Sequence, residues 1–280
     1  MELTPKIYKK AALQNLNGRW AMPVVITLIS TLLSLAFLFP FYPWKEYFAV
    51  LWGKRGPLTL ADYSIPKLII FMLIEAFIIP TLKMAELYIY SVLYKAKDSD
   101  KNVKFSDFIT GFSFWGKAIG STWWRGLWIF LWELAGMVPG IIIGIFIGII
   151  CIVTGSSTDI IMTITPLVIY AGVIPVVIYK GFQYCLTDYI IVDNEKAGVR
   201  QALNISKIIT KGYKAKIFVL ELSFIGWSIL AAIMPVGFLW LNPYMNTTLY
   251  HAFRTILEDY NRKHSEPKTV QTPGTTNSLN

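Results

Sequence analysis

Long apolar runs, free or nearly free of charge, alternate along this chain with shorter polar and basic stretches. A helix needs about 20 apolar residues to cross roughly 30 Å of hydrocarbon. Two early runs meet this length, and two longer runs contain internal turn signals at Gly155 and at Pro235–Gly237 that divide each into two crossings. The pattern therefore predicts an all-α membrane bundle of about six spans, near residues 20–41, 68–94, 122–153, 160–189, 217–234 and 238–254.

Lysine and arginine gather in the segments that this count places on one side of the membrane. Those segments hold 21 of the 26 basic residues, the opposite side holds four, and Lys83 lies within a span. Cytoplasmic loops of membrane proteins carry an excess of Lys and Arg. We therefore expect both termini in the cytoplasm. The first span, from Trp20, is too long for a cleavable signal sequence and is expected to remain as a membrane helix.

Two segments outside the spans have one apolar face and several lysines. Residues 4–17, within the cytoplasmic segment 1–19, have Thr4 as predicted cap and Pro5 at the first helical position. Residues 195–211 follow Asn194 and stop near Gly212. Either helix can lie on an anionic inner leaflet or dock on the protein's own cytoplasmic loops. Residues 255–280 are expected to form a largely disordered cytoplasmic tail after the membrane domain, 20–254.

The composition excludes an ordinary soluble domain. The chain is 55% hydrophobic and 15% charged, with a mean hydropathy of +0.51, against about 45–50% and about 25% for soluble domains. A net charge of +9 could indicate nucleic acid, but no zinc-finger, homeodomain or RNA-binding motif is present. We expect membrane lipids as partners and no nucleic acid. Cys151 and Cys185 lie in apolar runs and are expected to be packing residues.

Four glycines recur at every fourth position in the third predicted span: Gly136, Gly140, Gly144 and Gly148. This spacing places them on one helix face, where another helix can approach closely. The approaching helix can belong to the same chain or to a second copy or another membrane protein. The sequence alone does not distinguish these partners.

Charges inside the predicted spans are candidate functional residues, because a charge at the bilayer centre costs at least about 2.5–3.5 kcal/mol. Lys83 and Glu86 are three residues apart and can pair on one helix face. Lys180 can meet Glu133 or Glu221 across helices, and Glu75 is a further candidate. These residues form either a site for an ion or solute, or structural pairs and side chains that reach toward the membrane surface. Asp188 and Asp193 can contact a headgroup or cap helices.

Aromatic residues near predicted membrane surfaces are expected to act as interface anchors: Trp44, Trp52, Trp227, Trp240 and Tyr244. Motifs for enzyme chemistry are absent from the sequence, which contains no His-Glu-x-x-His, P-loop or Gly-x-Ser-x-Gly pattern. Its two histidines, His251 and His264, have no nearby cysteine or carboxylate pattern typical of a metal site. We therefore predict no catalytic residue, metal or cofactor.

Several short motifs follow one another in an order shared with a known family. They include Val138-Pro139-Gly140, Gly212-Tyr213-Lys214, Leu222-Ser223-Phe224-Ile225-Gly226-Trp227 and Leu239-Trp240-Leu241-Asn242-Pro243-Tyr244. On these residues the chain resembles the bacterial membrane proteins grouped as domain of unknown function 975. The resemblance implies a multi-span protein of the bacterial cytoplasmic membrane and supplies no activity. Glu133 stands where the family commonly has a small polar residue, which argues against a family-wide role for it.

Three function classes remain open at this point. The first is a non-enzymatic membrane protein that acts by binding or assembly with lipids, a second copy or another membrane protein. The second is a small transporter or channel-like component whose path is lined by Lys83, Glu86, Glu133 and Lys180. The third is a membrane-embedded enzyme. A transporter predicts a continuous polar path between the helices, a binding or assembly protein predicts a plugged core with isolated ion pairs, and an enzyme predicts a convergent set of reactive groups.

Overall fold

The computed structural model describes residues 4–41, 43–54, 56–57, 59, 64–96, 102–155 and 158–265. Throughout these residues the regular structure is helical and no strand occurs. The predicted all-α class is therefore confirmed.

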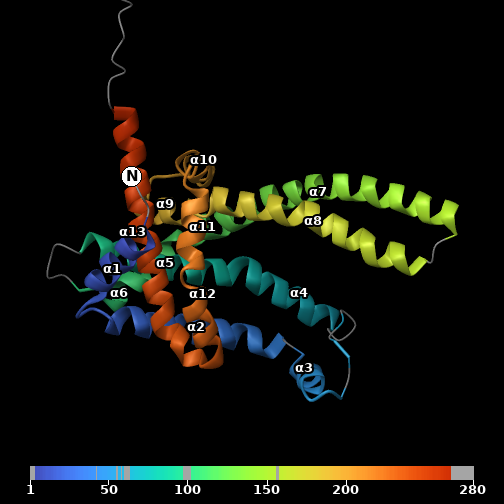
Figure 1. Cartoon of the computed structure of the whole chain (residues 1–280). Coiled ribbons are helices and arrows are strands. Elements are labelled where there is room, and N and C mark those ends of the chain that lie inside the picture. Colours follow the sequence, from blue (N-terminus) through green and yellow to red (C-terminus); the bar gives the residue numbers. More distant parts are fainter. Residues whose placement is uncertain are drawn as a thin grey trace, which may run out of the picture.

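The helices follow one another with short connections (Figure 1). In chain order they are α1 (Pro5–Leu16), α2 (Ala21–Leu38), η1 (Phe39–Phe41), α3 (Trp44–Leu51), α4 (Ile65–Leu73), η3 (Ile74–Ile78), α5 (Ile79–Lys95), α6 (Phe105–Gly111), η4 (Phe112–Phe114), α7 (Trp115–Thr154), α8 (Thr158–Tyr184), α9 (Thr187–Asp193), α10 (Val199–Ile209), α11 (Lys214–Leu222), α12 (Ile225–Ile233), η5 (Pro235–Gly237) and α13 (Phe238–Ser265). The segments η1, η4 and η5 are 3₁₀ turns, whereas η3 is a π-helical turn between α4 and α5.

Within the described residues, five stretches of helix are long and apolar enough to cross a membrane, as a multi-pass membrane protein requires. They are Ala21–Phe41, Ile65–Lys95, Phe105–Thr154, Thr165–Asp193 and Lys214–Ile233. The sixth predicted span, residues 238–254, is helical within α13 but is not among the five. Its asparagine, threonine and histidine side chains make it too polar. A count of six therefore stays a prediction.

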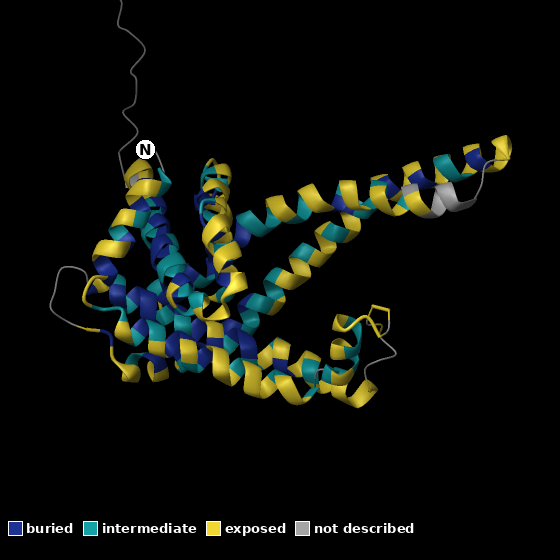
Figure 2. Ribbon diagram, turned by 60° about the horizontal axis from the view of Figure 1, so that its bottom comes forward, coloured by how far each residue is buried: buried dark blue, intermediate teal, exposed yellow. Residues whose placement is uncertain are grey.

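Helices α7 and α8 form an arm that projects from the rest of the described chain (Figures 1 and 2). With 40 residues, α7 is about 60 Å long at 1.5 Å per residue. It ends at Gly155, whose φ of +66° suits glycine because a Cβ atom would be strained there. Large apolar side chains on the arm point outward, among them Phe146, 63% exposed, and Val153, 80% exposed. Such a surface is stable in lipid and not in water.

The last hairpin crosses the arm instead of running alongside it. Helices α11, α12 and α13 lie at a steep angle to α7 and α8 in both views (Figures 1 and 2). Ser223 and Phe224 interrupt the helix between α11 and α12 without reversing the chain. At this break, Lys9 Nζ of α1 donates a 2.7 Å hydrogen bond to the Ser223 carbonyl. The predicted turn at Pro235–Gly237 joins α12 to α13.

The tightly packed core lies at the root of the arm, where α5, α9, α10 and α13 meet (Figure 2). Tyr90 of α5 is 1% exposed, and Tyr250 and Phe253 of α13 are fully buried. The rings of Tyr250 and Phe253 contact each other and Tyr189 of α9, and Tyr90 belongs to the same cluster of buried residues. This aromatic core holds together helices from three distant parts of the chain.

The two amphipathic segments both dock on the protein itself. Tyr8, Ala12 and Leu16 of α1 are buried, and α1 packs along α13. Helix α10 buries its apolar face against α7, α8 and α9. It begins after Gly198, later than the predicted residue 195, because Asn194 instead ends α9. Gly212, with φ of +86°, lies in the turn that follows α10.

Helix α13 extends beyond the predicted membrane domain. It continues to Ser265, so the first part of the segment expected to be a disordered tail, 255–280, is helical. In this part of α13, the Asp259 carboxylate accepts a hydrogen bond from the Tyr213 hydroxyl. Residues 266–280, the rest of the predicted tail, lie outside the described residues.

Candidate functional site

A polar pocket of about 330 Å³ lies among α5, α7, α9 and α13. Its polar lining comes from all four helices: Lys83, Glu86 and Tyr90 from α5, Ser121, Thr122 and Arg125 from α7, Asp188 and Tyr189 from α9, and Asn242 and Asn246 from α13. Pro80, Met84, Leu87 and Ala118 supply apolar lining. Ligand sites in proteins combine a concave surface with a few converging polar groups, and this pocket has both features.

The Glu86 carboxylate is held by three donors from three helices. Its Oε1 accepts hydrogen bonds from Thr27 Oγ1 of α2 at 2.8 Å, Tyr90 Oη at 3.2 Å and Asn242 Nδ2 at 3.0 Å. A half-buried carboxylate needs such partners because removal from water destabilises its charge. In the described structure the other oxygen, Oε2, accepts no hydrogen bond. The three donors therefore fix the carboxylate and leave one oxygen for a ligand.

A second carboxylate, Asp188 of α9, is neutralised by α7. Arg125 Nη1 lies 2.9 Å from Asp188 Oδ2, and Ser121 Oγ donates to Asp188 Oδ1 at 2.9 Å. Arg125 and Ser121 are four residues apart and share a helix face. The side chains of the ion pair are about one quarter exposed, so the pair borders the pocket.

The asparagines of α13 complete the polar wall. Asn246 Nδ2 donates to Asn242 Oδ1 at 2.7 Å and to the Asn242 carbonyl at 3.1 Å. Asn242 precedes Pro243, whose ring removes a backbone hydrogen bond from the helix interior. The side-chain amide of Asn242 donates a hydrogen bond to Glu86 Oε1. A chain of hydrogen bonds thus links α13 to α5.

The charges that line the pocket balance one another. Lys83 and Arg125 are cations, and Glu86 and Asp188 are carboxylates. Lys83 was predicted to pair with Glu86, but among the described residues it forms no ion pair within 4.0 Å. The pocket therefore contains one closed ion pair, Arg125–Asp188, and two charged groups that remain available, Lys83 and Glu86 Oε2.

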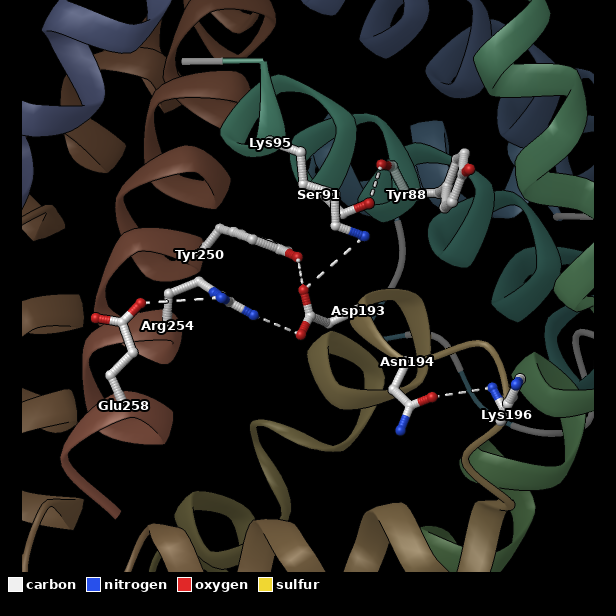
Figure 3. A network of polar contacts seen from close by, with 9 residues as sticks. All are labelled: Tyr88, Ser91, Lys95, Asp193, Asn194, Lys196, Tyr250, Arg254 and Glu258. Atoms are coloured by element: carbon white, nitrogen blue, oxygen red, sulfur yellow. Dashed lines mark hydrogen bonds and ion pairs between the residues drawn. The ribbon is translucent and has the colours of Figure 1, made fainter. Parts of the chain in front are cut away.

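A second polar cluster lies nearby, on the same helices but nearer the ends of α5 and α9 (Figure 3). Asp193 accepts hydrogen bonds from Tyr250 Oη at 2.9 Å and Arg254 Nη1 at 2.7 Å, and Lys95 Nζ lies 4.0 Å away (Figure 3). Tyr250 contacts Tyr189, which lines the pocket. The Asp193 cluster therefore adjoins the pocket through the contact of these two tyrosine rings, and none of its residues lines the pocket.

The other predicted intramembrane charges do not meet one another. Lys180 Nζ lies over the Trp132 ring, 3.6 Å from its centre, and no described ion pair joins it to Glu133 or Glu221. Glu133 and Glu221 are half-buried on α7 and α11, and Glu75 is exposed in η3. Of the predicted candidates, the structure brings only Lys83 and Glu86 into the pocket. No group of three His, Cys, Asp or Glu side chains suited to a metal occurs in the part of the chain described.

The glycine stripe of α7 faces α8 of the same chain. A Cβ atom added at Gly140 would lie 2.6 Å from Ile169 Cα, and one at Gly144 would lie 2.7 Å from Thr165 Cγ2. A Cβ atom added at Gly136 would lie 3.4 Å from Val173 Cα, an ordinary contact distance. A Cβ atom added at Gly148 would have no described atom within 4 Å, so the described close approach covers the first three glycines. Three of the four predicted glycines therefore serve an intramolecular contact.

The predicted interface anchors lie at the edges of the described structure. Trp44 stacks on Phe39 and donates its indole N–H to the Phe39 carbonyl at 2.7 Å, while Trp52 is 75% exposed. The remaining three anchors, Trp227, Trp240 and Tyr244, line an apolar hollow between α1, α12 and α13. No membrane depth follows from these contacts, so their role as anchors stays a prediction.

Sequence reasoning missed most of the pocket. Arg125, Ser121, Asn246 and Thr27 were not singled out as site residues, and Asp188 was left between headgroup contact and helix cap. One signal was present: Asn242 and Asn246 are four residues apart in a predicted span, which places two amides on one helix face. Nothing local to the chain indicates that this face meets Glu86.

Five helical stretches long and apolar enough to cross a membrane, with a polar pocket among the helices, are the features of a multi-pass helical membrane protein. A family model matches residues 3–259, so the chain belongs to the family described as Protein of unknown function (DUF975). The predicted family resemblance is confirmed. No curated protein and no solved structure matches the chain.

Proposed function

We propose that this protein is a non-enzymatic component of the bacterial cytoplasmic membrane that binds a small zwitterionic ligand in the polar pocket. The observation that carries the proposal is the balance of two cations and two carboxylates around one cavity of about 330 Å³. A site for a lone anion or cation would be unbalanced in charge. A volume near the lower end of the roughly 300–1,000 Å³ range of ligand sites suits a small molecule or a headgroup.

The two available charges determine how such a ligand would bind. Its cationic end would contact Glu86 Oε2, and its anionic end would contact Lys83. The donors Thr27, Tyr90 and Asn242 hold the Glu86 carboxylate in place before the ligand arrives. A preorganised site loses less side-chain entropy on binding.

The orientation of the protein follows from its basic residues. We place both termini in the cytoplasm, because 21 of 26 lysines and arginines then lie on the inner side. With both ends inside, the number of crossings is even, so we propose that α13 contributes a sixth crossing despite its polar residues. The arm then carries its apolar tip toward the outer leaflet.

Binding without passage is the form of activity that the core supports. A transporter needs a continuous polar path, whereas the pocket and the Asp193 cluster share no described residue and adjoin through the rings of Tyr189 and Tyr250. Both rings are at most 8% exposed. A binding or assembly protein is expected to have isolated polar clusters in a plugged core. The pocket offers no nucleophile paired with a base, so no reaction is proposed.

Ligand-dependent thermal stability of the purified protein in detergent tests the proposal. The probes are glycerophosphoethanolamine, which carries both charges, ethanolamine, which is only cationic, and glycerol 3-phosphate, which is only anionic. We expect the zwitterion to raise the unfolding temperature most, because a ligand that binds only the folded state stabilises it. Lys83→Gln should abolish this increase.

Lys67→Gln is the matched control, since Lys67 is exposed on α4 outside the pocket and its replacement removes the same charge. Equal stabilisation by all three probes, or an unchanged response in Lys83→Gln, would refute a zwitterion site.

A further inference from the structure

A groove at the root of the arm is strongly basic and is separate from the polar pocket. It has a volume of about 390 Å³ and lies between α7, the end of α8 and α10. Lys180, Arg200 and Lys207 line it, and none of its lining residues is acidic. Within the described part of the chain, these three cations have no carboxylate within 4.0 Å. Three uncompensated positive charges around one hollow attract an anion.

The wall of the groove is a row of three tryptophans. Trp124, Trp128 and Trp132 are spaced four residues apart and share one face of α7. Arg200 Cζ lies 4.5 Å from the centre of the Trp124 ring, and Lys180 Nζ lies 3.6 Å from that of Trp132. Contacts of this kind hold a cation in place while its remaining N–H groups stay free to donate. The groove therefore presents positioned donors on a flat aromatic wall.

The groove lies at the boundary between lipid-facing and basic surface. Helix α10 lies across the root of the α7–α8 arm (Figure 1). Beyond Trp132 the same face of α7 exposes large apolar side chains, with Ile142 49% and Phe146 63% exposed. Tryptophan concentrates at the headgroup level of membranes. An anion in the groove would thus be at headgroup depth, with apolar surface next to it for acyl chains.

We propose that this groove binds the phosphate of an anionic phospholipid headgroup. Arg200 and Lys207 of α10 donate charge-assisted hydrogen bonds to the phosphate oxygens, and Lys180 approaches from α8. The glycerol and acyl chains continue along the exposed face of α7. A free phosphate would use the same donors but would gain nothing from this apolar surface. The proposal does not depend on the zwitterion site, because the two cavities have no lining residue in common.

The test uses the full-length protein, delipidated in detergent and offered phosphatidylglycerol or phosphatidylcholine, with retained lipid counted by native mass spectrometry. We expect preferential retention of phosphatidylglycerol. Arg200→Gln with Lys207→Gln should weaken that retention at least about tenfold, since two charge-assisted hydrogen bonds are lost. Both residues are exposed, so the double variant should fold like the parent.

Lys196→Gln with Lys211→Gln is the control. These exposed lysines flank α10 and lie outside the groove lining, and their replacement removes the same two positive charges as the first double variant. It should retain phosphatidylglycerol within about twofold of the parent. Equal losses in both double variants, or equal retention of the two lipids, would show that no specific site exists. Displacement of the lipid by inorganic phosphate at equal concentration would overturn the assignment to a lipid headgroup.

If the first double variant is unstable by thermal unfolding, Lys180→Gln alone provides the same comparison. It removes one groove cation without altering α10. Retention of phosphatidylglycerol unchanged in this variant would also overturn the proposal.

Discussion

Four carboxylates in this protein accept hydrogen bonds from side chains of other segments: Glu86, Asp188, Asp193 and Asp259. Each donor set mixes neutral groups with, in three cases, an arginine. Charges removed from water are stable only with such partners. At the scale of the residue, these acids are therefore the points at which separate helices are tied together.

Replacement of Glu86 by leucine should destabilise the protein more than replacement by glutamine. Leucine leaves the Thr27, Tyr90 and Asn242 donors without an acceptor, and each unsatisfied buried donor costs about 1–3 kcal/mol. Glutamine keeps a carbonyl oxygen of similar size. We expect Glu86→Leu to lose at least about 2 kcal/mol relative to Glu86→Gln, measured by thermal unfolding in detergent. Equal unfolding temperatures would contradict the observed hydrogen bonds.

Acid should weaken the contact between α13 and the loop before α11. Hydrogen bonds from Lys263 and Tyr213 lower the pKa of Asp259 below its usual value. A third hydrogen bond comes from Arg262 Nη2, which lies 2.6 Å from Asp259 Oδ1. A lowered pKa in the folded state contributes stability that is present above the unfolded value of about 3.9 and is lost as the pH falls below it. We expect the unfolding temperature to decrease as the pH is lowered below about 4.

Asp259→Asn provides the comparison for this pH dependence. It should be less stable than the parent at neutral pH, and its stability should change less with acid because the titrating group is gone. If parent and variant lose stability in parallel as the pH falls, Asp259 is not the group responsible.

At the scale of the element, glycine position determines how closely two long helices approach. Among the described residues, the arm is held together over Gly136, Gly140 and Gly144, where α8 comes within contact of the α7 backbone. Small residues permit such contact, and dispersion forces then stabilise the pair in lipid. These three glycines therefore form the closely packed part of the arm that the structure describes.

Gly140→Leu should separate α7 from α8, whereas Gly126→Leu should be tolerated, because Gly126 of α7 is exposed and a Cβ atom added there meets nothing within 4 Å. At Gly140 an added Cβ already meets the Ile169 backbone at 2.6 Å, and backbone cannot move aside cheaply. Overpacking typically costs about 1–3 kcal/mol. We expect a lower unfolding temperature for Gly140→Leu alone. The interpretation fails if both leucine variants behave alike.

At the scale of the whole molecule, apolar arms extend from one aromatic core. The arm of α7 and α8 projects on one side, and the last hairpin crosses it at a steep angle (Figure 1). The core at the root holds polar clusters that lipid could not accommodate, whereas large apolar side chains such as Ile152 and Val153 are exposed near the tip of the arm. This division matches a protein with its root toward the basic, cytoplasmic face.

Single cysteines introduced into a variant without Cys151 and Cys185 should reveal this orientation. We expect Val153→Cys, at the exposed tip of the arm, to react with a membrane-impermeant maleimide in intact cells. His264→Cys, near the end of α13, should react only after the cells are opened, because basic segments remain in the cytoplasm. Labelling of His264→Cys in intact cells would reverse the proposed topology.

Much of the fold was predictable from local pattern. The positions of Gly155 and Gly212 at turns, the start of α1 after Thr4, and the apolar runs that form the five spans all depend on residues close together in the chain. Helix caps and hydrophobic length act over one or a few turns, so the sequence shows them directly. The late start of α10 and the helical part of the tail were missed, because packing on α7, α9 and Tyr213 extends or shortens those helices.

The order of amino acids by itself determined that this chain is helical, that most of its helices require an apolar solvent, and that Lys83 and Glu86 share a face. Only the tertiary structure decided which charges meet. Glu86 contacts Asn242, which is 156 positions away, while Lys180 lies on a tryptophan and not beside an acid. The reason is physical: pairing between helices depends on their crossing angles and rotations, which arise from the summed packing of many side chains and leave no local pattern.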